Sequence, residues 1–219
     1  MKAFIRKDEF NYIRRCLFDL NNSFGNCVDP LVLEGNKLYI QNKIYEKFTN
    51  LTSEQKEILN ISNIIDSSDI SFFIKNLEKY VYGMPKVTAS ELVKLFKKEK
   101  KLKIPDLNNN NKKIYLGWVD PAVNKLHIVY NYNNKLLKMS CRITNGKTSN
   151  SNICALCNYV GKQEEVTFVS PVCKTSNGGP DAYKSLGFYI CLDSEKCNER
   201  MISTEKIEEI IKEVNNIKD

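Results

Sequence analysis

The sequence lacks long apolar runs, and no stretch approaches the ~20 consecutive apolar residues that a membrane-spanning helix needs. Its first residues, MKAFIRKDEFNYIRR, also lack the apolar core of a secretory signal peptide. The hydrophobic share of 42% is nevertheless enough for a packed core in a chain of 219 residues. We therefore expect a soluble cytoplasmic protein that makes no contact with a membrane.

Signatures of catalysis are also missing. Histidine occurs once, as His127, which lies between Leu126 and Ile128 in a predicted strand and is therefore expected on a face of the sheet. It has no evident acid partner in the sequence. The chain contains no GxSxG, HExxH, P-loop or dinucleotide-binding motif. These absences predict a binding protein rather than an enzyme, with no small-molecule substrate.

The charge is unbalanced, because 33 basic residues face 26 acidic ones and leave a net charge of +7. Such an excess favours an acidic partner, which is either a nucleic acid or an acidic protein surface. Arginines, which are common in RNA recognition, are few: Arg6, Arg14, Arg15, Arg142 and Arg200.

Residues 1–84 show the periodicity of amphipathic helices. FNYIRRCLFDLNNSF places apolar residues three and four positions apart, which predicts one buried helix face. Three more helical segments follow, KLYIQNKIYEKF, LTSEQKEILNI and SSDISFFIKNLEKYVYG, and Thr52 with Gln55 has the spacing of a capping box. Short polar connections between these segments predict an antiparallel helical bundle as the first domain.

The pattern changes after Pro85. TASELVKLFKKEKKLKIP predicts an amphipathic helix that begins with a capping box of Thr88 and Glu91 and ends at Pro105. This segment is strongly basic, with Lys94, Lys97, Lys98, Lys100, Lys101 and Lys103. A short polar loop, DLNNNNKK, follows it.

Strand patterns dominate the rest of the chain. KIYLGWV, KLHIVYNY and KLLKMSCRI alternate with period two, and Asn133-Asn134 suits a tight hairpin turn. EVTFVS and GFYIC are two further strand candidates, and STEKIEEIIKEV predicts a closing helix with Ser203 or Thr204 as its N-cap. Residues 85–219 are therefore predicted to form an α+β domain with a small antiparallel sheet.

Two close cysteine pairs stand out among eight cysteines: Cys154 with Cys157, and, after 33 intervening residues, Cys191 with Cys197. In a long chain without a signal peptide, paired cysteines indicate metal ligands before disulfides. Four thiolates close the tetrahedral shell of a structural Zn²⁺ ion. A knuckle, a hairpin and a second pair near a helix predict a treble-clef-like zinc finger with one such ion. Unliganded core thiols and a redox pair of Cys154 and Cys157 are the alternatives.

Four segments in their order and spacing carry a resemblance: FNYIRR, LFKKEKKLKIP (95–105), GWVDPAVNKLHIVY (117–130), and CALC followed by FYICLDSEKCNE. Together they resemble the fusidic-acid-resistance proteins of FusB type. The resemblance implies a helical bundle followed by an α/β domain that binds elongation factor G through a zinc finger. It further implies that the protein frees the factor from fusidic-acid-stalled ribosomes, without chemistry on the drug, and acts as a monomer. The ligands implied are Cys154, Cys157, Cys191 and Cys197.

The resemblance also implies which residues contact the factor. Ile153 precedes the first ligand, Lys184 and Tyr189 precede the third, and Ile210 lies in the last helix. Phe188, beside Tyr189, adds aromatic area of the kind found at interface hot spots. Because neighbours in a strand point to opposite faces, one of Phe188 and Tyr189 is expected to be a core residue.

An RNA- or ribosome-binding zinc protein is the main alternative function. Lysines, an exposed aromatic residue and a zinc knuckle suit that function as well. A thiol oxidoreductase is a weaker alternative, since it requires a reactive thiol of low pKa rather than a closed metal site.

Overall fold

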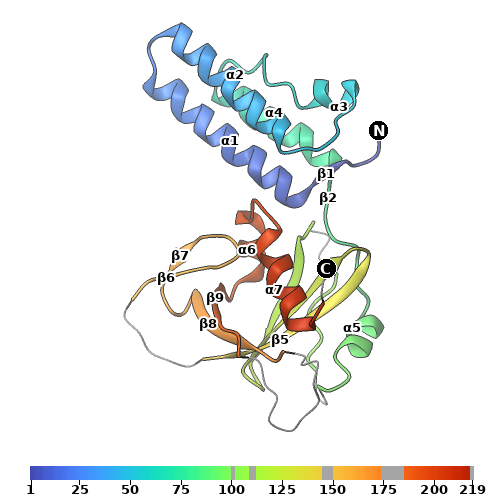
Figure 1. Cartoon of the computed structure of the whole chain (residues 1–219). Coiled ribbons are helices and arrows are strands. Elements are labelled where there is room, and N and C mark those ends of the chain that lie inside the picture. The colour runs from blue at the N-terminus through green and yellow to red at the C-terminus, as the bar shows by residue number, and fades with distance from the viewer. Residues whose placement is uncertain (100–101, 109–111, 145–149, 174–184, 218–219) are drawn as a thin grey trace. The chain divides into compact units, whose positions relative to one another are not determined.

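The computed structural model describes residues 1–99, 102–108, 112–144, 150–173 and 185–217. The chain divides into two compact units, Met1–Tyr82 and Gly83–Asp219 (Figure 1). The first unit contains one hydrophobic core and the second unit contains two. Within the described ranges, no helix combines the length and the apolar character needed to cross a membrane.

The first unit is helical, as its periodicity predicts. Its helices are α1 (Lys7–Asn26), α2 (Pro30–Glu46), α3 (Ser53–Ile58) and α4 (Ser67–Leu77), followed by the 3₁₀ helix η1 (Glu78–Tyr80). The predicted stripe of α1 is buried at Phe10, Ile13, Leu17 and Leu20. The capping box of α3 is present, with Thr52 and Gln55 bonding each other's backbone amides.

Sequence periodicity did not predict the small sheet that joins the two ends of this unit. Strands β1 (Ile5–Arg6) and β2 (Val81–Tyr82) pair in parallel, and the Phe4 amide donates to the Tyr80 carbonyl at 2.9 Å. Ile5 and Val81 are buried in the core of the unit. Two residues are too few to show a period, so the prediction of helices throughout residues 1–83 was wrong at these ends.

The second unit is built on a five-stranded antiparallel sheet, and its strands match the predicted segments. They are β3 (Tyr115–Asp120), β4 (Lys125–Tyr132), β5 (Lys135–Ile143), β8 (Val166–Pro171) and β9 (Phe188–Cys191), in the order β3-β4-β5-β8-β9. Asn133 and Asn134 join β4 to β5 with φ of 48° and 61°. Positive φ at both positions is what a tight type I′ hairpin turn requires, and asparagine tolerates it.

The two faces of this sheet support two separate cores. Along β4, Leu126, Ile128 and Tyr130 belong to a core that includes helix α7 (Glu205–Asn215). Val129 points to the opposite face and packs with helix α5 (Ala89–Leu95) and the chain that follows it. Because strand residues alternate between faces, α5 and α7 lie on opposite sides of the sheet (Figure 1).

Helix α5 is much shorter than the predicted helix of residues 88–105. It begins at the predicted capping box but ends at Leu95, and Phe96 turns inward with 1% exposure. Beyond it, the Lys103 carbonyl accepts a 2.8 Å hydrogen bond from the Trp118 indole. Leu102, Ile104 and Leu107 pack on the same core. Burial of these apolar residues along the sheet outweighs the helical propensity of the lysines, and Lys100 and Lys101 lie outside the described residues.

His127 lies on the α5 face of the sheet and is fully buried. Its ring packs against Phe96 and Trp118, with centroid distances of 5.1 and 5.2 Å, and its Nδ1 is 3.1 Å from the Ser140 hydroxyl. Burial lowers the pKa of this imidazole below its usual range. The folded protein therefore holds His127 neutral.

We expect this buried imidazole to make stability depend on pH. Below about pH 6.5, the unfolded chain binds a proton at His127 that the folded chain does not bind. The free energy of unfolding therefore decreases as the pH is lowered, by at most about 1.4 kcal/mol per pH unit. Urea unfolding of the wild type and a His127→Gln variant between pH 7.5 and 5.5 measures this. The variant should be less stable overall but should lose less stability on acidification. Equal pH dependence of the two proteins would contradict the prediction.

Candidate metal centre

The first cysteine pair lies in a tight knuckle. Strands β6 (Asn152–Ile153) and β7 (Val160–Gly161) form a short antiparallel hairpin, and Cys154 and Cys157 lie in the turn between them. The Cys154 amide donates to the Tyr159 carbonyl, and the Asn158 amide donates to the Cys154 carbonyl, both at 2.9 Å. Asn158 adopts φ of 58°, so the chain can reverse within four residues.

The second pair comes from β9 and helix α6 (Ser194–Arg200), which is consistent with the predicted pair near a helix. Cys191 is the last residue of β9 and Cys197 lies inside α6. The Asp193 carboxylate caps the helix by accepting from the Lys196 amide at 3.0 Å. At the other end of α6, the Arg200 guanidinium lies 3.7 Å from the centre of the Tyr159 ring, which ties the helix to the knuckle.

The four sulfur atoms form one compact cluster. All of them lie within 4.8 Å of one another, and Sγ–Sγ distances are 3.9 Å for Cys154–Cys197 and 3.6 Å for Cys157–Cys191. A tetrahedral Zn²⁺ ion with Zn–S bonds of about 2.3 Å places its sulfurs about 3.8 Å apart. The arrangement therefore fits a four-thiolate metal site, and the structure brings together all four cysteines that the sequence singled out.

The electrostatics of the cluster also suit a cation. The pKa of Cys154 is lowered, first by the Cys157 thiol and then by the Cys191 and Cys197 thiols, which hydrogen-bond to its sulfur. The pKa of Cys197 is raised, chiefly because its thiol is hydrogen-bonded to Cys154 and then to Cys157 and Cys191, which favours the protonated form. Four adjacent thiols cannot all ionise without a positive ion to offset their repulsion, and a divalent metal supplies that charge.

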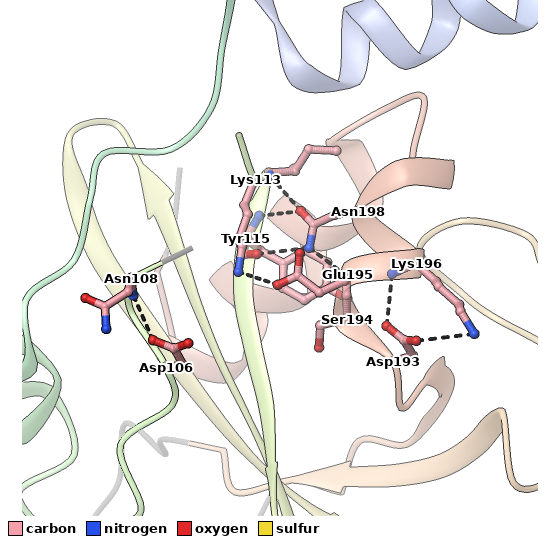
Figure 2. Close-up of polar contacts among 10 residues, drawn as sticks. Asp106, Asn108, Lys113, Tyr115, Asp193, Ser194, Glu195, Lys196 and Asn198 are labelled. Carbon is pink, nitrogen blue, oxygen red and sulfur yellow. Dashed lines mark hydrogen bonds and ion pairs between the residues drawn. The ribbon is translucent and has the colours of Figure 1, made fainter. Parts of the chain in front are cut away.

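Helix α6 is fixed to the edge strand β3 by the buried side chain of Asn198 (Figure 2). Its carbonyl oxygen accepts from the amides of Ile114 and Tyr115, at 2.6 and 3.1 Å. Its amide nitrogen donates to the Tyr115 and Ser194 carbonyls, at 3.1 and 2.8 Å. An ion pair between Lys113 and Glu195 joins the same two elements at the surface. The ligand Cys197 is therefore held in place by the sheet as well as by its own helix.

Two buried hydroxyl groups beside the cluster have no hydrogen-bond partner among the described residues, Tyr115 Oη and Ser194 Oγ. Burial raises the pKa of Tyr115 well above its usual range, and the next largest causes are the nearby Cys197 and Cys154 thiols. A protonated phenol and a hydroxyl are donors, and metal-bound thiolates are acceptors that such donors stabilise. These two orphaned groups fit a site whose sulfurs become thiolates when a metal binds.

Glycine within a strand was the one sequence signal that pointed to this region. A side chain at Gly117 would place its Cβ 2.4 Å from Ser194 Oγ and 2.8 Å from the Tyr115 ring. Glycine in a strand interior often marks a close approach by another element. Tyr115, Ser194 and Asn198 were not predicted from the sequence, because nothing in the local pattern relates β3 to α6.

The predicted contact residues lie in different environments. Ile153 and Tyr189 are exposed, by 59% and 39%, whereas Phe188 is partly buried and packs against the core. Ile210 is only 3% exposed, because the apolar face of α7 packs on the sheet, so its side chain is not available to a partner as predicted. Lys184 lies outside the described residues.

The fold and the cysteine cluster define a treble-clef zinc-finger domain that follows a helical unit. Two family models match this chain: "Elongation factor G-binding protein, N-terminal" over residues 4–85, and "FBP C-terminal treble-clef zinc-finger" over residues 88–216. The chain therefore belongs to the family of elongation factor G-binding proteins, which confirms its resemblance to the proteins of FusB type.

A solved structure described as "Structure of the fusidic acid resistance protein FusC" is similar to this chain. The TM-score is 0.77 at 23% sequence identity, and the match covers 97% of this chain and 98% of that one. At this identity the likeness shows a shared fold. A comparison with curated proteins found no match.

We expect the Tyr115 hydroxyl to strengthen metal binding. Tyr115→Phe removes the donor but keeps the buried ring, and loss of such a partner typically weakens metal affinity by about 10-fold or more. Competition with a chromogenic chelator measures the affinity. Tyr132→Phe, in a tyrosine that packs elsewhere on the same core, is the control and should behave as the wild type. Equal zinc affinity of all three proteins would show that the phenol does not bond the thiolates.

Proposed function

We propose that this protein binds elongation factor G through its C-terminal unit, on a surface shaped by one structural Zn²⁺ ion. The single observation that carries the proposal is the family match over residues 88–216, which covers the whole cysteine cluster and the exposed side chains next to it. The proposed ligands are Cys154, Cys157, Cys191 and Cys197.

The proposed contact surface combines the knuckle with the edge strand of the sheet. Ile153 of β6 pairs across the hairpin with Val160 of β7, and both are more than half exposed. The Ala155 amide donates to the Tyr189 carbonyl at 2.8 Å, so the knuckle and β9 are held side by side. Tyr189 is supported by an edge-to-face contact with Phe168 at 5.3 Å. Exposed apolar and aromatic groups on a rigid support are typical of interface centres.

The proposed surface differs from the predicted set of contact residues at Ile210 and Val160. Ile210 is left out, because its buried side chain supports the core under the sheet. Phe188 remains a proposed contact at the rim, where it offers only part of its ring, and Lys184 remains a proposed contact from outside the described residues. Val160 is added, since it shares its face with Ile153.

The proposed zinc ion has a structural role. When bound, it supplies four coordinate bonds and leaves no open position for water, which makes the site unsuited to metal-assisted hydrolysis. The residues around it orient the ligands: Asp193 caps the ligand helix, Asn198 holds that helix on β3, and the Cys191 amide donates to Cys154 Sγ at 3.4 Å. The ion thereby links the knuckle to the strand that carries Tyr189.

The proposed outcome of binding is release of elongation factor G from ribosomes stalled by fusidic acid, which is resistance by protection of the target. The descriptions of the matching families support a non-enzymatic role. Both matching families are described by binding or by a zinc finger, and neither description names a catalytic activity. We place the protein in the cytoplasm as a monomer that meets the ribosome through the factor.

We expect loss of one ligand to abolish metal binding and unfold the zinc-finger region. Cys191→Ser leaves three thiols, which cannot close the tetrahedral shell, and structural zinc contributes directly to folding free energy. Elemental analysis should find about one zinc per wild-type chain and almost none in the variant. Cys141→Ser is the control, since Cys141 is buried in β5 away from the cluster, so this variant can lose stability but should keep its zinc. A metal-free Cys191→Ser protein with wild-type circular dichroism would contradict the structural role.

We expect Tyr189→Ala and Ile153→Asp each to weaken binding to elongation factor G by at least about tenfold, as loss of an interface hot spot does. Calorimetry with the purified factor at physiological salt measures the affinity. Ile65→Asp alters a more exposed apolar residue of the first unit and should have no effect. Failure of the wild type to bind the factor would reject the proposed function. Full affinity of both variants would reject only the proposed surface.

A further inference from the structure

Positive charge is distributed unevenly along the chain. Residues 1–82 contain 11 basic and 11 acidic residues, so the whole net charge of +7 lies in residues 83–219. Within that unit, residues 83–140 contain 12 basic and 4 acidic residues. Residues 141–219, which include all four clustered cysteines, contain 10 basic and 11 acidic residues. The basic character therefore belongs to α5, the chain after it and β3–β5, and the zinc-finger half is close to neutral.

The acidic residues of this basic segment are already engaged. Glu99 accepts two hydrogen bonds of 2.8 Å from Lys125, and buried Asp120 accepts from the Lys103 and Ala122 amides. Glu91 completes the capping box of α5. Asp106 accepts from the Asn108 amide at 2.9 Å (Figure 2). These carboxylates bond the backbone or Lys125, and among the described residues none of them forms an ion pair with Lys94, Lys97 or Lys98.

Three lysines form the centre of the excess. Lys94, Lys97 and Lys98 are exposed, and in the described part of the chain none of them forms an ion pair. They follow one another at spacings of three and one residues, while Leu92, which precedes them, and Phe96, which lies among them, turn into the core. The inward packing of these apolar residues directs the lysines to solvent, and we call the three together the lysine surface.

The chemistry of the lysine surface suits phosphate groups rather than bases or an apolar protein patch. The neighbouring aromatic residues, Phe96 and Trp118, are buried, so no ring of this core is available to stack on a base. Val93 is the exposed apolar residue of α5. Lysine ammonium groups act as point charges, and contacts of this kind position a nucleic acid without reading its sequence.

The lysine surface is separate from the proposed docking surface. It packs on Leu116 and Trp118 of β3 and on Val129 of β4, whereas Tyr189 lies in β9, at the opposite edge of the sheet. A partner that contacts Ile153 and Tyr189 therefore leaves the lysine surface free. One molecule can engage two partners at once.

We propose that the lysine surface of Lys94, Lys97 and Lys98 binds the phosphate backbone of RNA. The choice of RNA rests on the proposed function, because a protein that acts on a translation factor works beside ribosomal RNA. The contact is sequence-independent and salt-sensitive, and it holds the protein near the factor that its other surface recognises.

A triple variant, Lys94→Gln with Lys97→Gln and Lys98→Gln, tests this proposal against a labelled RNA hairpin by fluorescence anisotropy. At low salt we expect the affinity to fall at least tenfold. The slope of log K against log salt should shrink by about 2, since each lost phosphate contact removes about 0.7 to 0.9. Lys56→Gln with Lys75→Gln and Lys79→Gln is the control, because it removes the same charge from exposed lysines of the first unit. Circular dichroism checks that both triple variants are folded.

The outcomes separate this proposal from its alternatives. Weak RNA binding by the wild type, or equal losses in both triple variants, would overturn it. Binding to free elongation factor G is measured in parallel and should be unchanged in the lysine-surface variant. If that variant instead loses the factor while it keeps RNA, the lysine surface binds an acidic protein and the proposal is wrong. If the wild type binds RNA through these lysines but does not bind the factor, the proposed function fails and this inference stands.

Discussion

The convergence of four cysteine thiols is the constraint on which the C-terminal half of the structure depends. The elements that carry them are too short to be stable alone, since β6 and β7 have two residues each and α6 has seven. Two ligands lie in the knuckle, one at the end of β9 and one in α6. The four thiols bring these segments together directly, so we expect folding of this region to be coupled to binding of a metal.

The cluster also acts on the rest of the unit through α6. β3 is an edge strand, and the Asn198 side chain forms hydrogen bonds with its backbone at Tyr115 and with the neighbouring Ile114 amide. Gly117 has no side chain, which leaves room for Ser194 to lie close to this strand. The sheet then carries α7 on one face and α5 on the other. The apolar surface around Tyr189 lies at the β9 edge of this sheet, whereas the chain that carries Lys97 packs on β3 and β4.

Much of the fold was predictable because its signals are local. Strands β4 and β5 have the predicted bounds, since alternation and an Asn-Asn turn depend on neighbours in sequence. The capping boxes at Thr52 and Thr88 were equally readable. The end of α5 was not predictable from the local sequence. Phe96 leaves the helix and packs in a core to which a strand contributes other residues, such as Trp118. The β1–β2 pair depends on two segments some 75 residues apart along the chain.

The site shows the same division. The spacing of Cys154, Cys157, Cys191 and Cys197 by itself determined the four members of the cluster and the chemistry they suit, because two close thiol pairs suit a soft divalent metal wherever the chain places them. Only the tertiary structure decided that Tyr189 is exposed, that Ile210 is buried and that Tyr115 lies against the thiols. Periodicity identifies the faces of an element, but which face is covered depends on what packs there.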